Sequence, residues 1–321
     1  MRRDGKRPPK NQFQIGETGG AIARASRLAY DALFLRVENH LTRAEIEKIV
    51  EPIIRKCLRD FGDYSCKDAS EEEFAAGTEG TLRPAVRRVS LIVQLAQSAL
   101  GADGGEGLEV GSGYGYLLFP MAMLLPHIRW STVEHPDRRY FGREDYRQAM
   151  REYNCQLTAA NITHEPLAYP DNYFSLVTFS ETIEHLPVER LNFVLSELTR
   201  VLRTGGILIA SSPNQASLEN RLRLLKGKSI LEMPDENPVA KGIFGHIRLY
   251  TPVEVESTMS KLGFSLERCV IESNNSAYRG TSSKSFRRRL YRLYERIEGR
   301  LGMLRSLGDT WYMVFRKMSC K

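Results

Sequence analysis

The sequence has little of what marks secreted, cysteine-metal or membrane-spanning proteins. Its 321 residues include five cysteines, which are scattered, odd in number and never paired as CxxC. This pattern argues against a disulfide framework or a cysteine-zinc site and predicts a reduced protein. The most apolar run, YLLFPMAMLLP at 116–126, is too short to cross a bilayer and contains Pro120. No apolar segment follows the basic N-terminus, so no secretory signal is indicated. We therefore expect a cytoplasmic protein, and leave contact with a membrane surface open.

Basic residues are in moderate excess and gather near both ends of the chain. Lys and Arg number 46 against 39 Asp and Glu, a formal net charge of +7. The two clusters are MRRDGKRPPK at 1–10 and SKSFRRRLYRLYERIEGR at 283–300. Such clusters can meet phosphates, anionic lipid or acidic substrates, or can be plain solvated surface.

Composition and periodicity divide the chain into three parts. Residues 1–20 are rich in Gly, Pro and charge and are predicted to be a disordered tail. Residues 21–104 predict a helical N-terminal extension, in which an acidic connector at 68–81 separates two amphipathic stretches. Residues 105–321 predict the main domain, with helical insertions at about 216–245 and 276–306.

The main domain alternates short apolar runs with helical segments. This alternation predicts an α/β fold, a Rossmann-like seven-stranded and mostly parallel sheet with helices on both faces. In such sheets a ligand binds beyond the C-terminal ends of the strands. A helix is predicted to begin at Thr251 as N-cap, with Glu254 completing a capping box and Gly263 at its end. The predicted strands are 107–111, 128–135, 155–159, 175–181, 205–214, 264–272 and 309–317.

A glycine-rich loop, LEVGSGYGYL at 108–117, follows the first of these strands. Dinucleotide loops have the pattern G-x-G-x-x-G, which would require glycine where this chain has Tyr116. Glu109 stands at the strand end, where a carboxylate is unfavourable beside a pyrophosphate but suits a ligand with a cationic amine. These features disfavour NAD and ATP.

Five segments, in order, resemble the class I S-adenosylmethionine-dependent methyltransferases. The loop EVGSGYG at 109–115 is similar to their first motif, E/D-x-G-x-G-x-G, and Glu134 ends the second strand where Rossmann-like folds place an acid. Segments 166–186, 197–214 and 246–264 are similar to later motifs of the superfamily. The last of these resembles the branch with ubiquinone-pathway and bacterial cell-envelope methyltransferases. The resemblance covers roughly 105–273 and the last strand, and implies an enzyme with S-adenosylmethionine as methyl donor.

The resemblance also implies a place for each part of the cofactor. Glu109 would face the methionine end, and Glu134 would hold both ribose hydroxyls. Asn161 stands where the family often has Asp, and its amide oxygen can still accept a hydrogen bond from the adenine amino group. The implied cofactor contacts are Glu109, Gly111, Ser112, Gly113, Gly115, Glu134, Asn161 and Ile162, the last packing against adenine.

Candidate catalytic groups follow the fourth and fifth strands. In one interpretation Glu181, His185 and His246 line the acceptor pocket, where a base removes the proton of an acceptor hydroxyl. In a second, Glu181, Glu184, His185 and His246 form a divalent metal site for Mg²⁺, Mn²⁺ or Fe²⁺. That site would be similar to the one in small-RNA 3′-terminal 2′-O-methyltransferases and in some quinone O-methyltransferases. In a third, His185 is a structural histidine. We take the site without a metal as the expectation.

The acceptor is predicted less directly. Basic amphipathic helices at 218–225 and 286–304 can lie on an anionic membrane, bind nucleic-acid phosphates or simply pack on the sheet. The chain has no RNA-binding module signature, so we expect O-methylation of a small-molecule, glycan- or lipid-linked acceptor rather than of nucleic acid. The alternatives are a metal-assisted RNA 2′-O-methyltransferase and a non-catalytic cofactor-binding scaffold at a membrane or partner. The N-terminal helices are expected to form a lid over the cofactor.

Overall fold

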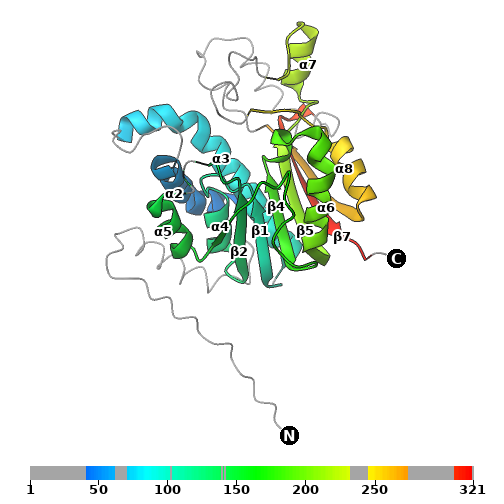
Figure 1. Cartoon of the computed structure of the whole chain (residues 1–321). Coiled ribbons are helices and arrows are strands. Elements are labelled where there is room, and N and C mark those ends of the chain that lie inside the picture. The colour runs from blue at the N-terminus through cyan, green and yellow to red at the C-terminus, as the bar shows by residue number, and fades with distance from the viewer. Residues whose placement is uncertain are drawn as a thin grey trace. The chain divides into compact units, whose positions relative to one another are not determined.

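The computed structural model describes residues 41–61, 71–101, 103–138, 140, 142–231, 245–273 and 307–319, with the backbone alone at 71–80 (Figure 1). All of these belong to one compact unit, Leu41–Lys321. The predicted tail at 1–20 and the helical insertion at 276–306 lie outside the described residues, as does the part of the first insertion at 232–244.

A seven-stranded sheet forms the centre of this unit, with strand order β3-β2-β1-β4-β5-β7-β6. Strands β1 to β5 run parallel, and β7 lies antiparallel between β5 and β6. The predicted Rossmann-like, mostly parallel sheet is confirmed. The strands are β1 (Gly105–Val110), β2 (Ile128–Glu134), β3 (Gln156–Ala159), β4 (Phe174–Ser180), β5 (Leu202–Pro213), β6 (Phe264–Glu272) and β7 (Thr310–Lys317).

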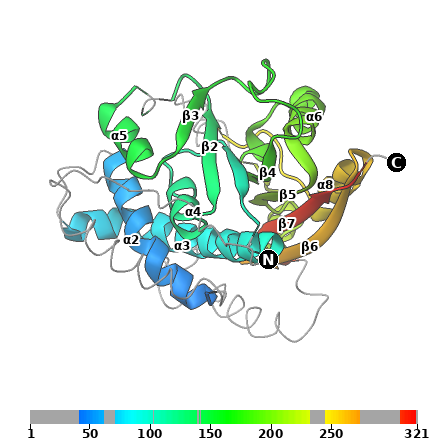
Figure 2. The same ribbon diagram turned by 90° about the horizontal axis from the view of Figure 1, so that it is seen from below.

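Helices cover both faces of the sheet. Figure 2 shows α3 (Glu71–Leu100) and α4 (Leu118–Leu124) on one face and α6 (Leu191–Val201) and α8 (Pro252–Lys261) on the other. With both faces covered, the central strands are apolar throughout rather than alternating, and β4 is buried from Phe174 to Phe179. The strand order reverses between β1 and β4, so a ligand crevice is expected at their C-terminal ends.

The N-terminal helices pack on the sheet and on each other. In α2 (Arg43–Phe61) the residues Ile46, Val50 and Ile54 are completely buried, at the spacing of one helix face. Helix α3 contacts α2, α4, β5 and β7. The Arg43 guanidinium forms an ion pair with Glu272 at the end of β6, with Nη2 donating to Oε2 at 2.7 Å. The helical extension is therefore joined to β6, the last strand in the sheet order.

Two predicted boundaries are wrong. The connector expected at 68–81 is helical from Glu71 onward, because its EEEFAA stretch favours helix and outweighs the cost of Gly77 and Gly80. The run ERLNFVLSELTRVLR at 189–203 predicts a helix that includes Leu202. The helix ends at Val201, and Leu202 enters β5 and pairs with Phe174 of β4.

Other local predictions are confirmed. The capping box of α8 is present, with the Thr251 and Glu254 side chains bonded to each other's backbone N–H, and Gly263 follows the helix with φ +83°. The remaining described helices are α5 (Glu144–Glu152), α7 (Leu218–Leu225) and the short 3₁₀ turns η1 (Ile183–His185) and η2 (Val188–Arg190). Among the described helices, none has the length and apolarity needed to span a bilayer.

Candidate active site

The sequence-predicted site residues gather at the C-terminal ends of β1 to β5. Glu109 is the second-to-last residue of β1, Glu134 ends β2, and Asn161 follows β3. Glu181 follows β4 directly, and η1 comes two residues later. Because these strands are parallel, their ends meet at one edge of the sheet, as the strand order requires.

The glycine loop depends on backbone conformations that favour glycine. Gly111, Gly113 and Gly115 have φ values of +78°, +53° and +81°. A Cβ on Gly111 would lie 2.8 Å from Oγ1 of Thr182, and one on Gly115 would lie 2.5 Å from the Phe119 ring. The loop thus passes closely over the start of α4 on one side and the residue after β4 on the other.

Glu109 is a buried carboxylate that lacks a complete set of partners. It is 3% exposed, and its Oε2 atom has no hydrogen-bond partner among the described residues. Burial, with a smaller contribution from nearby Glu134, raises the pKa of Glu109 to about 8. A cationic ligand group placed here would supply the missing partner and restore the charge of the carboxylate.

Glu134 is fixed over the glycine loop by hydrogen bonds. Its Oε2 accepts from the Gly113 backbone N–H at 2.8 Å and from the Tyr140 hydroxyl at 3.0 Å. Its Oε1 accepts from the His135 backbone N–H at 2.9 Å. Each carboxylate oxygen therefore already has a protein partner, and its contact with the ribose hydroxyls stays a prediction.

Asn161 is arranged differently from the sequence expectation. Its Oδ1 accepts hydrogen bonds from the Thr163 backbone N–H at 3.1 Å and from the Thr163 hydroxyl at 2.7 Å. The oxygen expected to face an adenine amino group is thus engaged in a local turn. Ile162 is half-buried and packs on the core cluster beside this turn.

Aromatic residues that sequence reasoning did not single out support the loop. The Tyr146 hydroxyl donates to the Gly113 carbonyl at 3.2 Å and lies 3.5 Å from the Ser112 hydroxyl. Phe61, at the end of α2, meets the Tyr146 ring edge-on at 5.2 Å between centroids. The helical extension therefore reaches the residues that support the cofactor loop through this aromatic contact. In the sequence these aromatic residues are marked only by the recurrence of tyrosine after the second strand, at 140, 146 and 153.

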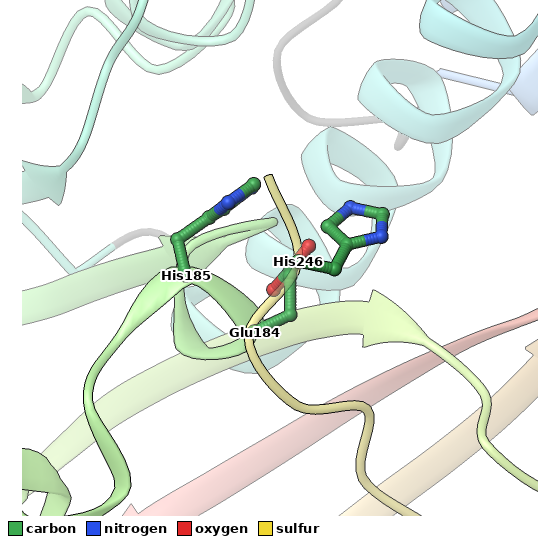
Figure 3. Close-up of side chains that lie close together, drawn as sticks. All are labelled: Glu184, His185 and His246. Carbon is green, nitrogen blue, oxygen red and sulfur yellow. The ribbon is translucent and has the colours of Figure 1, made fainter. Parts of the chain in front are cut away.

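Three of the predicted polar residues converge beyond β4. Ligand atoms of Glu184, His185 and His246 all lie within 4.8 Å of one another, and Figure 3 shows the Glu184 carboxylate between the two imidazole rings. Glu184 is completely buried, and among the described residues neither carboxylate oxygen has a partner in good hydrogen-bond geometry, although the Ser212 side chain is a close neighbour. Burial, followed by the proximity of Glu181, raises the pKa of Glu184 well above its usual range.

Backbone hydrogen bonds join the two segments that carry these residues. The Glu184 carbonyl accepts from the N–H groups of Ile247 at 2.7 Å and Arg248 at 3.2 Å. In return, Nδ1 of His185 lies 3.0 Å from the Gly245 carbonyl oxygen. Since a carbonyl can only accept, Nδ1 carries the proton and Nε2 keeps a free lone pair. Burial lowers the pKa of His185, which favours this neutral form.

Glu181 lies near that cluster but is paired with a cation. Its Oε2 accepts from Nη1 of Arg88 at 2.9 Å, and its Oε1 accepts from the Ser211 hydroxyl at 3.1 Å. Glu181 also has φ +50°, a conformation that non-glycine residues rarely adopt and that tends to occur at functional sites. The grouping of Glu181 with Glu184, His185 and His246 is therefore not seen: this structure places three of the four together.

Arg88 was not predicted as a site residue. It comes from α3 in the helical extension, and its Nη2 also donates to the Tyr116 hydroxyl at 3.2 Å. No motif marks it, because its sequence surroundings are those of an ordinary amphipathic helix.

S-adenosylmethionine fits this donor set. Its α-ammonium group matches the incompletely bonded Glu109, and the three glycines let a ligand approach the loop backbone. The base-capable Nε2 of His185 lies on a neighbouring loop of the same edge. These residues can hold a sulfonium donor and receive a proton beside it.

Comparison with known proteins supports this assignment. Residues 108–210 match the family model of the methyltransferase domain. No protein of curated function matches the sequence.

Solved structures with a similar backbone include an S-adenosylmethionine-dependent methyltransferase from Archaeoglobus fulgidus, with 16% identity and a TM-score of 0.49, covering 76% of this chain and 99% of that one. A putative sarcosine dimethylglycine methyltransferase from Galdieria sulphuraria has 17% identity and a TM-score of 0.45, covering 73% and 88%. The PH0226 protein from Pyrococcus horikoshii OT3 has 18% identity and a TM-score of 0.45, covering 82% and 98%. Similarities this distant add nothing to the domain match.

Proposed function

We propose that the protein is an S-adenosylmethionine-dependent methyltransferase and that it methylates a hydroxyl oxygen. The match of residues 108–210 to the methyltransferase-domain model supports the first part of this proposal. The acceptor is a small molecule or a glycan- or lipid-linked group. The observation that carries the proposal is the state of His185: a neutral imidazole with Nδ1–H held by the Gly245 carbonyl and Nε2 available as a base.

The reaction is an in-line displacement at the methyl carbon. The acceptor oxygen forms a bond to that carbon while the carbon–sulfur bond breaks. The electron pair of the broken bond stays on sulfur and neutralises the sulfonium charge. The hydroxyl proton passes to Nε2 of His185. The protein's main contributions are to align the two reactants and to remove this proton. Glu109 and the glycine loop hold the donor, and η1 holds the base.

The substitution His185→Gln tests the role of the base. It should lower kcat by about 10²–10⁴-fold while S-adenosylmethionine affinity stays within about twofold. The control is His127→Gln, because His127 lies in the turn before β2, at the opposite edge of the sheet. Equal activity of wild type and His185→Gln on the identified acceptor would contradict the proposal.

A second candidate, metal-assisted methyl transfer, is favoured by one observation. The Glu184 carboxylate is buried between two histidines without a partner in good hydrogen-bond geometry among the described residues, and such buried charges are normally paired or bound to metals. One carboxylate and two imidazoles suit Fe²⁺, Mn²⁺ or Zn²⁺. A divalent ion bound there would act as a Lewis acid on the acceptor hydroxyl. The metal-assisted RNA 2′-O-methyltransferase belongs to this candidate.

Chelation separates the two candidates. The protein is treated with EDTA, and metal content, S-adenosylmethionine binding and methyl transfer are measured before and after adding Mn²⁺, Fe²⁺ or Zn²⁺. Full activity in metal-free protein supports the base mechanism alone. Activity that is lost on chelation, restored by one metal and absent in Glu184→Gln supports the second candidate.

The acceptor class is tested with a labelled methyl donor. The protein is incubated with fractionated lipid, glycan and RNA extracts, and the labelled product is identified by mass spectrometry. We expect an O-methyl ether in the lipid, glycan or small-molecule fraction. Label in RNA, or on nitrogen or carbon, would contradict the proposal.

A further inference from the structure

Exposed apolar side chains gather at the edge of the sheet where the active site lies. Among the described residues, seven large hydrophobic side chains are exposed. Tyr173 precedes β4 and Met318 follows the antiparallel β7, so both lie at the opposite edge. The other five, Val188, Leu224, Leu225, Ile247 and Val253, belong to segments beyond the C-terminal ends of β4 and β5.

Helix α7 is the most prominent part of this face. It begins five residues after β5 ends, and Figure 1 shows it projecting away from the sheet. None of its eight residues is buried, although four of them are leucines. Leu225 is 83% exposed and Leu224 is 58% exposed, so no described residue covers the C-terminal turn of the helix.

Basic side chains flank these leucines. Residues 218–228 contain Arg221, Arg223, Lys226 and Lys228 against the single acid Glu219. Arg221, Lys226 and Lys228 are exposed. Adjacent leucines and cations on a short projecting helix match an interface whose interior is apolar and whose surface is anionic. A soluble protein partner would require a shaped apolar surface, but not this excess of one charge.

We propose that this face docks on an anionic phospholipid bilayer, with Leu224 and Leu225 inserted at the headgroup boundary and the basic residues of 218–228 on the phosphates. Ile247 is adjacent to His246, and Val253 is in the first turn of α8, so docking brings the acceptor side of the active site to the membrane surface. Docking itself requires no methyl transfer, so it is tested separately from the proposed function.

The test is co-sedimentation of the full chain with vesicles of phosphatidylcholine containing phosphatidylglycerol, compared with phosphatidylcholine alone. Wild type should bind the anionic vesicles more tightly. The double variant Leu224→Ser/Leu225→Ser should bind at least about tenfold more weakly. Neutralising Lys226 and Lys228 with Gln should weaken binding about fivefold per charge at low salt.

The matched control is Met318→Ser, which removes an exposed hydrophobic side chain from the opposite edge. It should bind vesicles as wild type does, and all variants should retain S-adenosylmethionine binding as proof of folding. Equal vesicle binding by wild type and Leu224→Ser/Leu225→Ser would overturn the proposal. A second outcome would also overturn it: wild type does not bind vesicles but forms a dimer in sedimentation velocity, and the double variant does not. That result would assign the face to contact with a second copy of the chain.

Discussion

At the scale of single residues, the three loop glycines should differ in how far they tolerate a methyl group. Gly111→Ala puts a residue with a Cβ into a left-handed backbone conformation, where the Cβ overlaps Thr182. Gly115→Ala places its Cβ 2.5 Å from a carbon of the Phe119 ring. Gly113→Ala meets no close atom and carries only the conformational cost, about 1–2 kcal/mol. We therefore expect S-adenosylmethionine affinity to fall least for Gly113→Ala.

Calorimetric titration of the three variants measures this order. Gly142→Ala is the matched control, because a Cβ there meets no atom within 4 Å and the residue has no positive φ. Affinity that is unchanged in Gly111→Ala, or lost equally in the control, would contradict the close approach of loop and cofactor.

Glu109 predicts a pH dependence of cofactor binding. Its pKa of about 8 in the free protein means that the carboxyl is largely protonated at neutral pH. Pairing with an ammonium requires the charged form, so binding releases a proton and the association constant should rise up to tenfold per pH unit, up to about pH 8. Above that pH the ligand's own amine, with a pKa near 8, begins to lose its charge. Titrations at several pH values should show this rise, and Glu109→Gln should bind weakly with a flat profile.

The same carboxylate should destabilise the cofactor-free protein. The folded-state pKa of Glu109 lies above its unfolded value of 4.5, so its contribution to stability is lost as pH rises from about 4.5 to about 8. Glu109→Gln should therefore raise the free energy of unfolding at pH 8, by an amount of the order of 4 kcal/mol. Urea unfolding at about pH 5 and pH 8 checks this, since the difference between variant and wild type should shrink at the lower pH. A difference that is the same at both pH values would contradict the buried, protonated state.

At the scale of secondary-structure elements, the capping box of α8 is a local stability device. The Thr251 hydroxyl accepts from the Glu254 backbone N–H, and the Glu254 carboxylate accepts from the Thr251 backbone N–H at 2.8 Å. Thr251→Ala should lower the free energy of unfolding by about 1 kcal/mol and leave cofactor affinity unchanged, whereas Thr251→Ser should restore stability. Urea unfolding of the three proteins measures the effect. An alanine variant as stable as wild type would show that the cap contributes nothing.

Elements were predictable where burial leaves a clear pattern in the sequence. Central strands that are covered on both faces form continuous apolar runs, so the parallel β4 and the antiparallel β7 could both be located within one or two residues. The acidic start of α3 contains two glycines and therefore predicts a connector. Packing of the later part of that helix on α2 and the sheet extends the helix through them.

The site was predictable only as far as its motifs reach along the chain. The glycine loop, Glu134 and the Glu184–His185 pair follow strand ends, so their positions followed from the strand pattern. Arg88, Tyr146 and Phe61 reach the site through tertiary packing, which no spacing in the sequence encodes. The pairing of Glu181 with Arg88 was also hidden, because it is a contact between α3 and the end of β4.

At the scale of the whole molecule, the ion pair of Arg88 and Glu181 joins the helical extension to the end of β4. Both side chains are less than one-fifth exposed. Arg88→Met leaves a buried carboxylate without its cation, and we expect it to lower the free energy of unfolding by about 3 kcal/mol. The double variant Arg88→Met/Glu181→Met should recover most of that loss, because it removes both charges together. Denaturant unfolding of the four proteins in this cycle measures the coupling, and strictly additive losses would show that the pair does not link the two parts.

The central claim is that the C-terminal edge of the sheet binds S-adenosylmethionine through the loop after β1. Calorimetric titration of the full chain with S-adenosylmethionine tests it most directly, with Gly111→Arg as the variant that fills the loop. We predict measurable heat and a single site for wild type, and no binding for a folded Gly111→Arg protein. No heat from wild type, or equal heat from both proteins, would contradict the account.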